Sequence, residues 1–176
     1  TLPPNCNCNT PVVVLVTGSG QHNRDEEIFG HRPFAVLADA LARHGIASLR
    51  YDDRGYGNAA LDFSSFTTDD FKDDAEAVIR YLRNRFSRVG VIGHSEGGTI
   101  ALMIAAEGKA DYVVTMAAMA VSGLQTLVSQ HRASLAQAFL PVTVLDAYSN
   151  ALSDAFGKLA NGACVEDIDV GNVPAM

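Results

Sequence analysis

The sequence predicts an α/β fold in which a mostly parallel sheet is flanked by helices. Three observations predict this class. Short continuous runs of apolar, β-branched residues indicate strands that are covered on both faces. Stretches with apolar residues at helical spacing separate these runs. A Gly-x-Ser-x-Gly turn, Gly93 to Gly97, joins one such run directly to a helix-like segment.

The composition is that of an ordinary globular protein with a substantial core. The chain has 176 residues, of which 48% are hydrophobic and 19% charged. Its net charge of −7 argues against nucleic acid or an anionic membrane surface as a partner. No apolar run approaches the roughly 20 residues that span a bilayer. The chain starts at Thr1 without an initiator Met, which suggests a processed protein or an excised segment and slightly favours a periplasmic or secreted location.

The first strand and helix are expected in the first 45 residues. The apolar run Pro11 to Val16 predicts a buried parallel strand that ends in a glycine-rich loop, Thr17 to Gln21. A helix is expected from Pro33 to His44, with Gly45 as its C-terminal cap. Its apolar residues fall on one face: Phe34, Leu37, Ala38 and Leu41.

The second strand and helix follow with the same alternation. The strand Ile46 to Tyr51 runs into a polar turn, Asp52 to Gly57. After a Ser/Thr-rich loop, Thr67 or Thr68 is expected to cap a helix from about Asp69 to Arg85. The apolar face of this helix is Phe71, Ala75, Val78, Ile79 and Leu82.

The third strand leads into the turn around Ser95. The segment Val89 to Gly98 has the order strand, sharp turn, helix, and the helical run continues from Thr99 to Ala106. Such a turn is strained, so the residues around the serine must be small, and Gly93 and Gly97 meet this need. The strain would expose Ser95 Oγ, and the free N–H groups at the helix start would stabilise a growing negative charge. A glycine-rich connection without chemistry is the alternative.

The last third of the chain is predicted to hold one more strand and two helices. The strand spans Tyr112 to Ala120, and the first helix spans about Leu124 to Phe139. The second helix starts with Pro141 in its first turn. Asp146 could end a short strand and serve as a catalytic acid, but the longer helical period makes it an outside candidate. The tail from Asn161 to Met176 is expected to be irregular.

The serine turn resembles the nucleophile elbow of the α/β-hydrolases. The resemblance covers Val12 to about Gly123, which would be the third to sixth strands of an eight-stranded sheet. Two helices inserted after the sixth strand would form a lid. The resemblance implies that Ser95 is the nucleophile and that the backbone N–H groups of Ser19 and Glu96 form the oxyanion hole. One of the two residues after Ser19 could serve as the donor instead.

Two loops carry a closer resemblance to part of this family. Gly18 to Glu26, with Gly30 to Phe34, resembles bacterial esterases related to dienelactone hydrolases and acyl-CoA thioester hydrolases. This resemblance suggests that Arg24 and Asp25 brace the loop by an ion pair.

The turn after the second strand resembles the Asp-x-Arg-Gly-x-Gly turn of the hydrolases. Asp52 and Arg54 are expected to tie this turn down. A catalytic acid in the turn is an alternative, but the family order of Ser, then Asp or Glu, then His argues against it.

The sequence offers no histidine where the family order requires one. Its five histidines are His22, His31, His44, His94 and His131. Only His131 follows Ser95, and it falls in a predicted lid helix. We therefore expect the chain to be the front and middle of a longer hydrolase, with the triad acid and His beyond Met176 and little turnover by itself. Its parts would be a hydrolase core (1–123), a helical lid (124–160) and an irregular tail (161–176).

The predicted function is the hydrolysis of carboxylic esters or thioesters through an acyl-enzyme, with a peptidase as a variant. The alternative is a non-catalytic binding or scaffold domain that keeps the fold. A nucleotide site is disfavoured, because Asn23 stands where a third glycine would be and no phosphate-loop lysine is present. The three cysteines lack zinc-site spacing, so no metal and no cofactor are predicted. The expected partner is a small-molecule ester, and homo-oligomers could form through the exposed edge of the sheet.

Overall fold

The structure, a computed structural model, describes residues 1–168, and it divides the chain into two compact units. The first unit is Thr1–Ala118 and the second is Met119–Met176. Each unit is described by itself below. None of the helices among the described residues combines the length and the apolar character that a bilayer crossing requires.

The first unit is built on a four-stranded, fully parallel sheet, as predicted. The strands are β1 (Val12–Val16), β2 (Ala47–Leu49), β3 (Val89–His94) and β4 (Tyr112–Met116). Their order across the sheet is β2-β1-β3-β4. Val16 pairs with Gly93, and His94 pairs with Met116, so these three strands end at one edge of the sheet. The loop after β1 and the turn after β3 therefore meet there.

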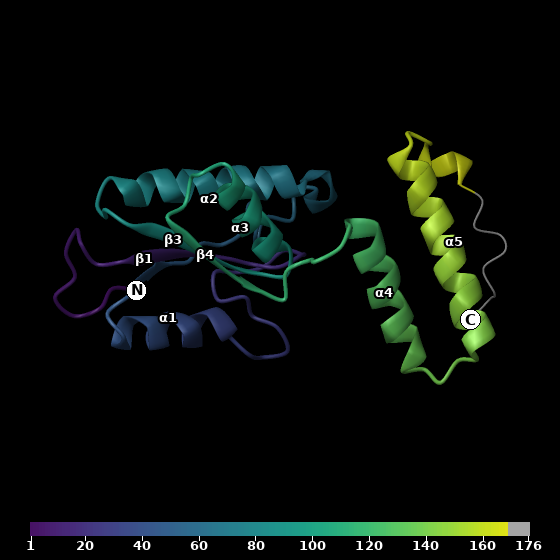
Figure 1. Ribbon diagram of the computed structural model, residues 1–176, viewed down its shortest axis with the longest axis horizontal. Coiled ribbons are helices and arrows are strands. Elements are labelled where there is room, and N and C mark those ends of the chain that lie inside the picture. The colour runs from purple at the N-terminus through teal and green to yellow at the C-terminus, as the bar shows by residue number, and fades with distance from the viewer. Residues whose placement is uncertain (169–176) are drawn as a thin grey trace. The chain divides into compact units, whose positions relative to one another are not determined.

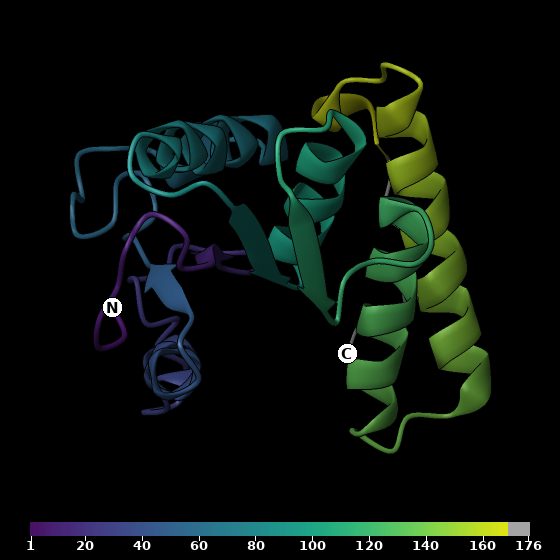
Figure 2. The ribbon, with the colours of Figure 1, turned by 60° about the vertical axis from the view of Figure 1, so that its left-hand side comes forward.

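Helices cover both faces of this sheet (Figure 1). The helices are α1 (Pro33–Arg43), α2 (Thr68–Arg83) and α3 (Glu96–Ala106), with α2 and α3 on one face and α1 on the other. Figure 2 shows the sheet as a layer between α1 and α2. The residues of β1 alternate between the two cores: Val12 and Val14 pack with α2 and α3, whereas Val13 and Leu15 pack with α1. Every side chain of β1 is buried, which explains its continuous apolar run.

The start of α2 follows from a reciprocal cap. Thr67 is the N-cap, and the side chain of Asp70 reaches back to the Thr67 backbone N–H over 2.9 Å. The capping box satisfies two N–H groups that an isolated helix end would leave unpaired. A short 3-10 helix, Phe63–Ser65, precedes it within the Ser/Thr-rich loop.

Both edge strands are shorter than predicted. β2 has three residues instead of six, since it pairs only with β1 and then leaves the sheet. β4 ends at Met116 instead of Ala120, because Ala117 adopts a positive φ of 53° that is incompatible with a strand. The prediction that this strand is buried is wrong: among residues 1–168 it pairs with β3 alone, and Val114 is 48% exposed.

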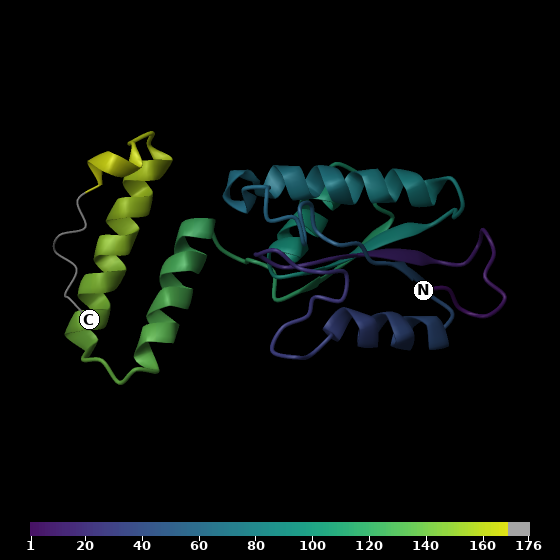
Figure 3. The same ribbon diagram turned by 180° about the vertical axis from the view of Figure 1, so that it is seen from behind.

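The second unit contains a helical hairpin (Figure 3). The helices α4 (Gly123–Ala136) and α5 (Val142–Ala160) run antiparallel. Pro141 is the N-cap of α5, one position before its predicted place in the first turn. Asp146 lies inside α5 and forms an ion pair with Arg132 of α4 over 2.7 Å, so it does not end a strand. A short 3-10 helix, Val165–Asp167, lies in the predicted tail, and residues 169–176 of that tail lie outside the described residues.

Candidate functional site

Ser95 occupies the sharp turn between β3 and α3. It is the N-cap of α3, and its backbone has φ 52° and ψ −115°, a combination that is strained for any residue except glycine. The Ser95 N–H donates to the Met116 carbonyl oxygen over 2.8 Å, and the Ser95 carbonyl oxygen accepts from the Gly98 N–H over 3.0 Å. Hydrogen bonds to β4 and within α3 thus hold the strained residue at the carboxyl edge of the sheet.

The two glycines of the turn are required by the packing of backbone on backbone. A Cβ atom at Gly93 would lie 1.9 Å from the carbonyl oxygen of Gly97. A Cβ atom at Gly97 would lie 2.2 Å from the carbonyl oxygen of Val16 at the end of β1. No side-chain rotation relieves either contact, because both neighbours are main-chain atoms. The turn therefore has room only for glycine at these positions.

The glycine-rich loop after β1 lies directly against the serine. A Cβ atom at Gly18 would be 3.2 Å from Ser95 Cβ. The Gly18 N–H is not available to a substrate, because it donates to Glu26 Oε1 over 2.8 Å. Within residues 1–168, the next N–H along the loop, that of Ser19, donates no hydrogen bond. The Ser19 N–H is thus unpaired one residue after the contact with Ser95.

The start of α3 supplies a second source of unpaired N–H groups. Glu96 and Gly97 are the first residues of the helix, and among the described residues their N–H groups have no acceptor. The positive end of the helix dipole lies at the same place and favours negative charge. The side chain of Glu96 accepts a hydrogen bond from Thr68 Oγ1, which ties the carboxylate to the start of α2.

A buried carboxylate fastens the loop after β1 to the loop after β2. Asp53 is 6% exposed, and it accepts hydrogen bonds from Thr17 Oγ1 and from the His22 N–H, each over 2.8 Å. Burial raises the pKa of Asp53, and the two hydrogen bonds oppose that shift. Both carboxylate oxygens are engaged in holding the loop, which gives Asp53 a structural role.

Arg24 and Asp25 brace the same loop, but not through an ion pair with each other. Arg24 binds Asp52 through three hydrogen bonds, one from its backbone N–H and two from its guanidinium, the shortest of 2.7 Å. Asp25 forms its ion pair with Arg50. Both partners lie in the segment that follows β2, so the loop is held to its neighbour rather than to itself. Arg54 lies in the turn Asp52 to Gly57, and its ion pairs with Asp70 and Asp74 attach this turn to α2, in keeping with the role expected for Arg54.

Glu26 is the residue of this site that sequence analysis missed. It is 2% exposed, and its Oε1 accepts from the Gly18 N–H and lies 2.8 Å from His94 Nδ1. It also has a positive φ of 51°. In the sequence, Glu26 is one of three consecutive acids in a polar loop, and only its burial distinguishes it from the others.

Four of the five histidines have ring contacts away from the Ser95 hydroxyl, and the fifth, His31, is exposed and bonds only through its backbone, to Ile28, among the described residues. His94 pairs with Glu26, the His22 ring lies 3.0 Å from the Ser19 carbonyl oxygen, and the His44 ring contacts the Ala40 carbonyl oxygen in α1. His131 belongs to the second unit, where its ring packs near Tyr148 of α5. Among residues 1–168, no histidine is hydrogen-bonded to Ser95 Oγ.

The arrangement of strand, serine turn and helix agrees with a family match that spans most of the chain. Residues 13–170 match the family described as the alpha/beta hydrolase family. The chain belongs to the α/β hydrolase family. The resemblance inferred from the serine turn is therefore confirmed, and so is the predicted fold class.

A named esterase is among the proteins to which this chain is similar. The chain is 38% identical to the esterase EstD of Thermotoga maritima over 110 residues, which are 61% of this chain and 26% of that protein. It is similar to Est1E of Butyrivibrio proteoclasticus, solved with ferulic acid bound, at 25% identity and a TM-score of 0.50, covering 62% of this chain and 42% of that one.

The fold extends to more distant hydrolases. A proline iminopeptidase from Mycobacterium smegmatis is 22% identical and has a TM-score of 0.57, covering 92% of this chain and 51% of that one. At this identity, the likeness concerns the fold alone. The chain thus spans about a quarter to a half of the length of these relatives.

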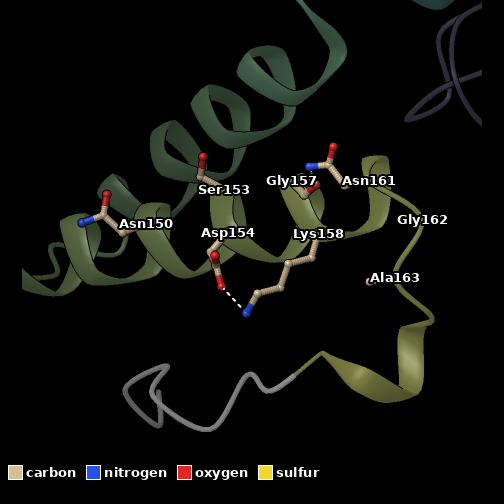
Figure 4. Close-up of a pocket in the computed structure, with 8 residues that line it drawn as sticks. All are labelled: Asn150, Ser153, Asp154, Gly157, Lys158, Asn161, Gly162 and Ala163. Carbon is tan, nitrogen blue, oxygen red and sulfur yellow. Dashed lines mark hydrogen bonds and ion pairs between the residues drawn. The ribbon is translucent and has the colours of Figure 1, made fainter.

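A surface pocket on the second unit contains none of the predicted site residues (Figure 4). It lies along the end of α5 and the turn that follows. Its lining residues are Asn150, Ser153, Asp154, Gly157, Lys158, Asn161, Gly162 and Ala163. The ion pair between Asp154 and Lys158 lies along its wall. The pocket has no strained serine or buried acid, so the turn at Ser95 remains the candidate site.

Proposed function

We propose that this chain carries the nucleophile and the oxyanion hole of a serine hydrolase that acts on carboxylic esters or thioesters. The observation that carries the proposal is the strained backbone of Ser95 at the start of α3, with unpaired N–H groups on both sides. Similarity to named esterases supports an ester as the substrate. The two helices α4 and α5 would form the lid.

In the proposed reaction, Ser95 Oγ attacks the carbonyl carbon of the ester. The carbonyl oxygen becomes an oxyanion that accepts hydrogen bonds from the backbone N–H groups of Ser19 and Glu96. The tetrahedral intermediate collapses, the alcohol or thiol leaves with a proton, and an acyl-enzyme remains on Ser95. Water then hydrolyses the acyl-enzyme and restores the free hydroxyl.

A general base must take the proton from the serine hydroxyl, because an unactivated serine is a poor nucleophile. His22, His44 and His94 have other ring partners, and His131 lies in the second unit. Among residues 1–168, the exposed His31 is bonded only through its backbone, to Ile28, and not to Ser95 Oγ. We therefore propose that the base and the acid that orients it lie beyond Met176 in the complete gene product, and that residues 1–176 alone turn over slowly.

The test is fluorophosphonate labelling together with ester hydrolysis, carried out on the complete gene product. We expect labelling at Ser95 and hydrolysis of nitrophenyl esters, with both abolished in Ser95→Ala. The matched control is Ser153→Ala, a half-buried serine of α5 outside the candidate site. Esters of rising acyl length would then define the acyl pocket. Unchanged labelling of Ser95→Ala would overturn the proposal.

A non-catalytic binding or scaffold domain is the second candidate function. The observation that favours it is that no histidine among residues 1–168 is hydrogen-bonded to Ser95 Oγ. A complete gene product that neither reacts with the fluorophosphonate nor hydrolyses any ester of the series would decide for this candidate.

A further inference from the structure

One carboxylate oxygen joins the two segments that form the candidate site. Glu26 Oε1 accepts the Gly18 N–H over 2.8 Å and lies 2.8 Å from His94 Nδ1. Gly18 directly precedes Ser19, and His94 directly precedes Ser95. The residues before the proposed oxyanion donor and before the proposed nucleophile are thus held by the same atom.

Glu26 is a buried acid whose lost hydration its partners must compensate. Glu26 is 2% exposed, and an acidic side chain is seldom buried so completely unless partners compensate its lost hydration. Its partners are one backbone N–H and one ring nitrogen of the serine turn, with no lysine or arginine among its hydrogen bonds in the described chain. The acidic neighbours on either side, Asp25 and Glu27, instead pair with arginines near the surface.

The backbone at Glu26 forms a tight turn, and the Glu26 side chain is buried. Glu26 has a φ of 51°, and its N–H donates to the Asn23 carbonyl oxygen over 2.9 Å in a tight turn. The Asn23 side chain accepts from the Asp25 N–H and caps the same turn. A non-glycine residue in this conformation carries strain, which the surrounding hydrogen bonds must offset.

Resting on the proposed function, we propose that Glu26 is a positioning residue that sets the distance between the Ser95 hydroxyl and the Ser19 N–H. Its oxygen holds Gly18 and His94 together, so the loop after β1 and the serine turn cannot separate while an oxyanion forms. The efficiency of an oxyanion donor depends on its placement, and the loss of one donor costs about 100-fold or more in kcat. Glu26 need not touch the substrate to control this placement.

The experiment compares three substitutions of Glu26 in the complete gene product. In Glu26→Gln, the amide oxygen can still accept from both partners, so we expect kcat to stay within about tenfold of the parent. Glu26→Asp keeps the charge but is one methylene too short to reach both segments. Glu26→Asp and Glu26→Ala should lower kcat about 100-fold, with KM changed less than about threefold, because the interaction at stake is made in the transition state.

The matched control is Glu76→Gln, another buried acid, which loses its ion pairs to Lys72 and Lys109 but leaves Gly18 and His94 untouched. It should lower thermal stability without changing kcat. If Glu26→Ala does not fold, Glu26→Asp and the exchange rate of the Gly18 amide hydrogen still decide the question. We expect that hydrogen to be protected in the parent and in Glu26→Gln, and to exchange faster in Glu26→Asp.

The outcomes separate this proposal from the proposed function. Parent-like kcat in Glu26→Asp, or an unprotected Gly18 amide in the parent, would overturn the role of Glu26 even if Ser95→Ala is inactive. A fall in kcat that only follows the loss of stability, with Glu76→Gln falling equally, would also overturn it. Activity that survives in Ser95→Ala would instead remove the function on which the proposal rests.

Discussion

At the scale of single residues, the candidate site depends on the absence of side chains at two glycines beside Ser95. Gly93 and Gly97 have no side chain because the main chain occupies the space where a Cβ atom would be. This close approach of β1, β3 and α3 is what allows Ser95 to take up its strained conformation. The requirement is steric and local to the turn, so it can be tested without knowledge of the substrate.

We predict that Gly97→Ala destabilises the protein by about 2–3 kcal/mol, because the new Cβ atom would overlap the carbonyl oxygen of Val16 and force the backbone apart. The matched control is Gly157→Ala, also inside a helix, where nothing lies within 4 Å of the added atom. That change should stabilise α5 by up to about 1 kcal/mol, since alanine is the better helix former. Denaturant unfolding measures both, and equal stability of Gly97→Ala and the parent would contradict the steric argument.

At the scale of elements, charged side chains at the ends of strands and helices fix how these elements meet. Asp111 directly precedes β4, and its Oδ2 accepts the Val89 N–H at the start of β3 over 2.6 Å. The Arg83 guanidinium at the end of α2 lies 2.6 Å from the same oxygen. The Asp111 carboxylate therefore joins the end of α2 to the starts of β3 and β4, at the edge of the sheet where the strands begin. Ser95 lies at the opposite edge, where they end.

The hydrogen bond from the Val89 N–H lowers the pKa of Asp111 below its ordinary value of 3.8, and the Arg83 guanidinium lowers it further. The pKa of Asp111 is thus lower in the folded chain than in the unfolded chain. At a pH between these two values, the unfolded chain binds more protons, so stability falls as the pH falls through this window. The contribution is complete above about pH 5 and is lost below the folded pKa.

We predict that Asp111→Asn lowers the free energy of unfolding by about 1 kcal/mol at pH 7, a modest value because the side chain is partly exposed. The deficit should shrink as the pH falls below about 4, where the parent loses the same charge. Denaturant unfolding at several pH values measures this. Asp39→Asn, which removes a surface pair with Arg43, is the control and should change little at any pH. A deficit that is constant with pH would show that the charge of Asp111 does not matter.

At the scale of the whole molecule, the sheet of the first unit has an exposed edge strand, β4. In the part of the chain that the structure describes, β4 pairs with β3 on one side and with no strand on the other, and its central residue, Val114, is half exposed. An apolar edge strand with free N–H and carbonyl groups is a template for pairing with another chain. The net charge of −7 opposes association at long range, but it is screened within about 8 Å at physiological salt.

We predict that residues 1–176 self-associate through β4 as protein concentration rises. Sedimentation equilibrium in a reducing buffer should show an average mass above that of the monomer. Val114→Lys places a charge on this edge strand and should weaken association about tenfold or more. Thr126→Lys, on α4 in the second unit, is a control for the added charge and should leave association unchanged. A monomeric parent at all concentrations would contradict the prediction.

What the sequence by itself determined are the features that neighbours in the chain decide. These are the strand, turn and helix around Ser95, the need for glycine beside it, and a threonine cap at the start of α2, which the sequence placed at Thr67 or Thr68. Steric limits on the backbone and helical periodicity act over a few residues, so a short segment contains the information.

Only the tertiary structure decided which distant groups meet. It turned the predicted pair of Arg24 and Asp25 into two pairs with the segment after β2, and it ended β4 at Met116, before the positive φ of Ala117. It also brought Glu26 to His94, 68 positions away in the chain. A polar loop offers several acids of similar local character, and only the packing of strand ends at one edge of the sheet selects the one that is buried against the site.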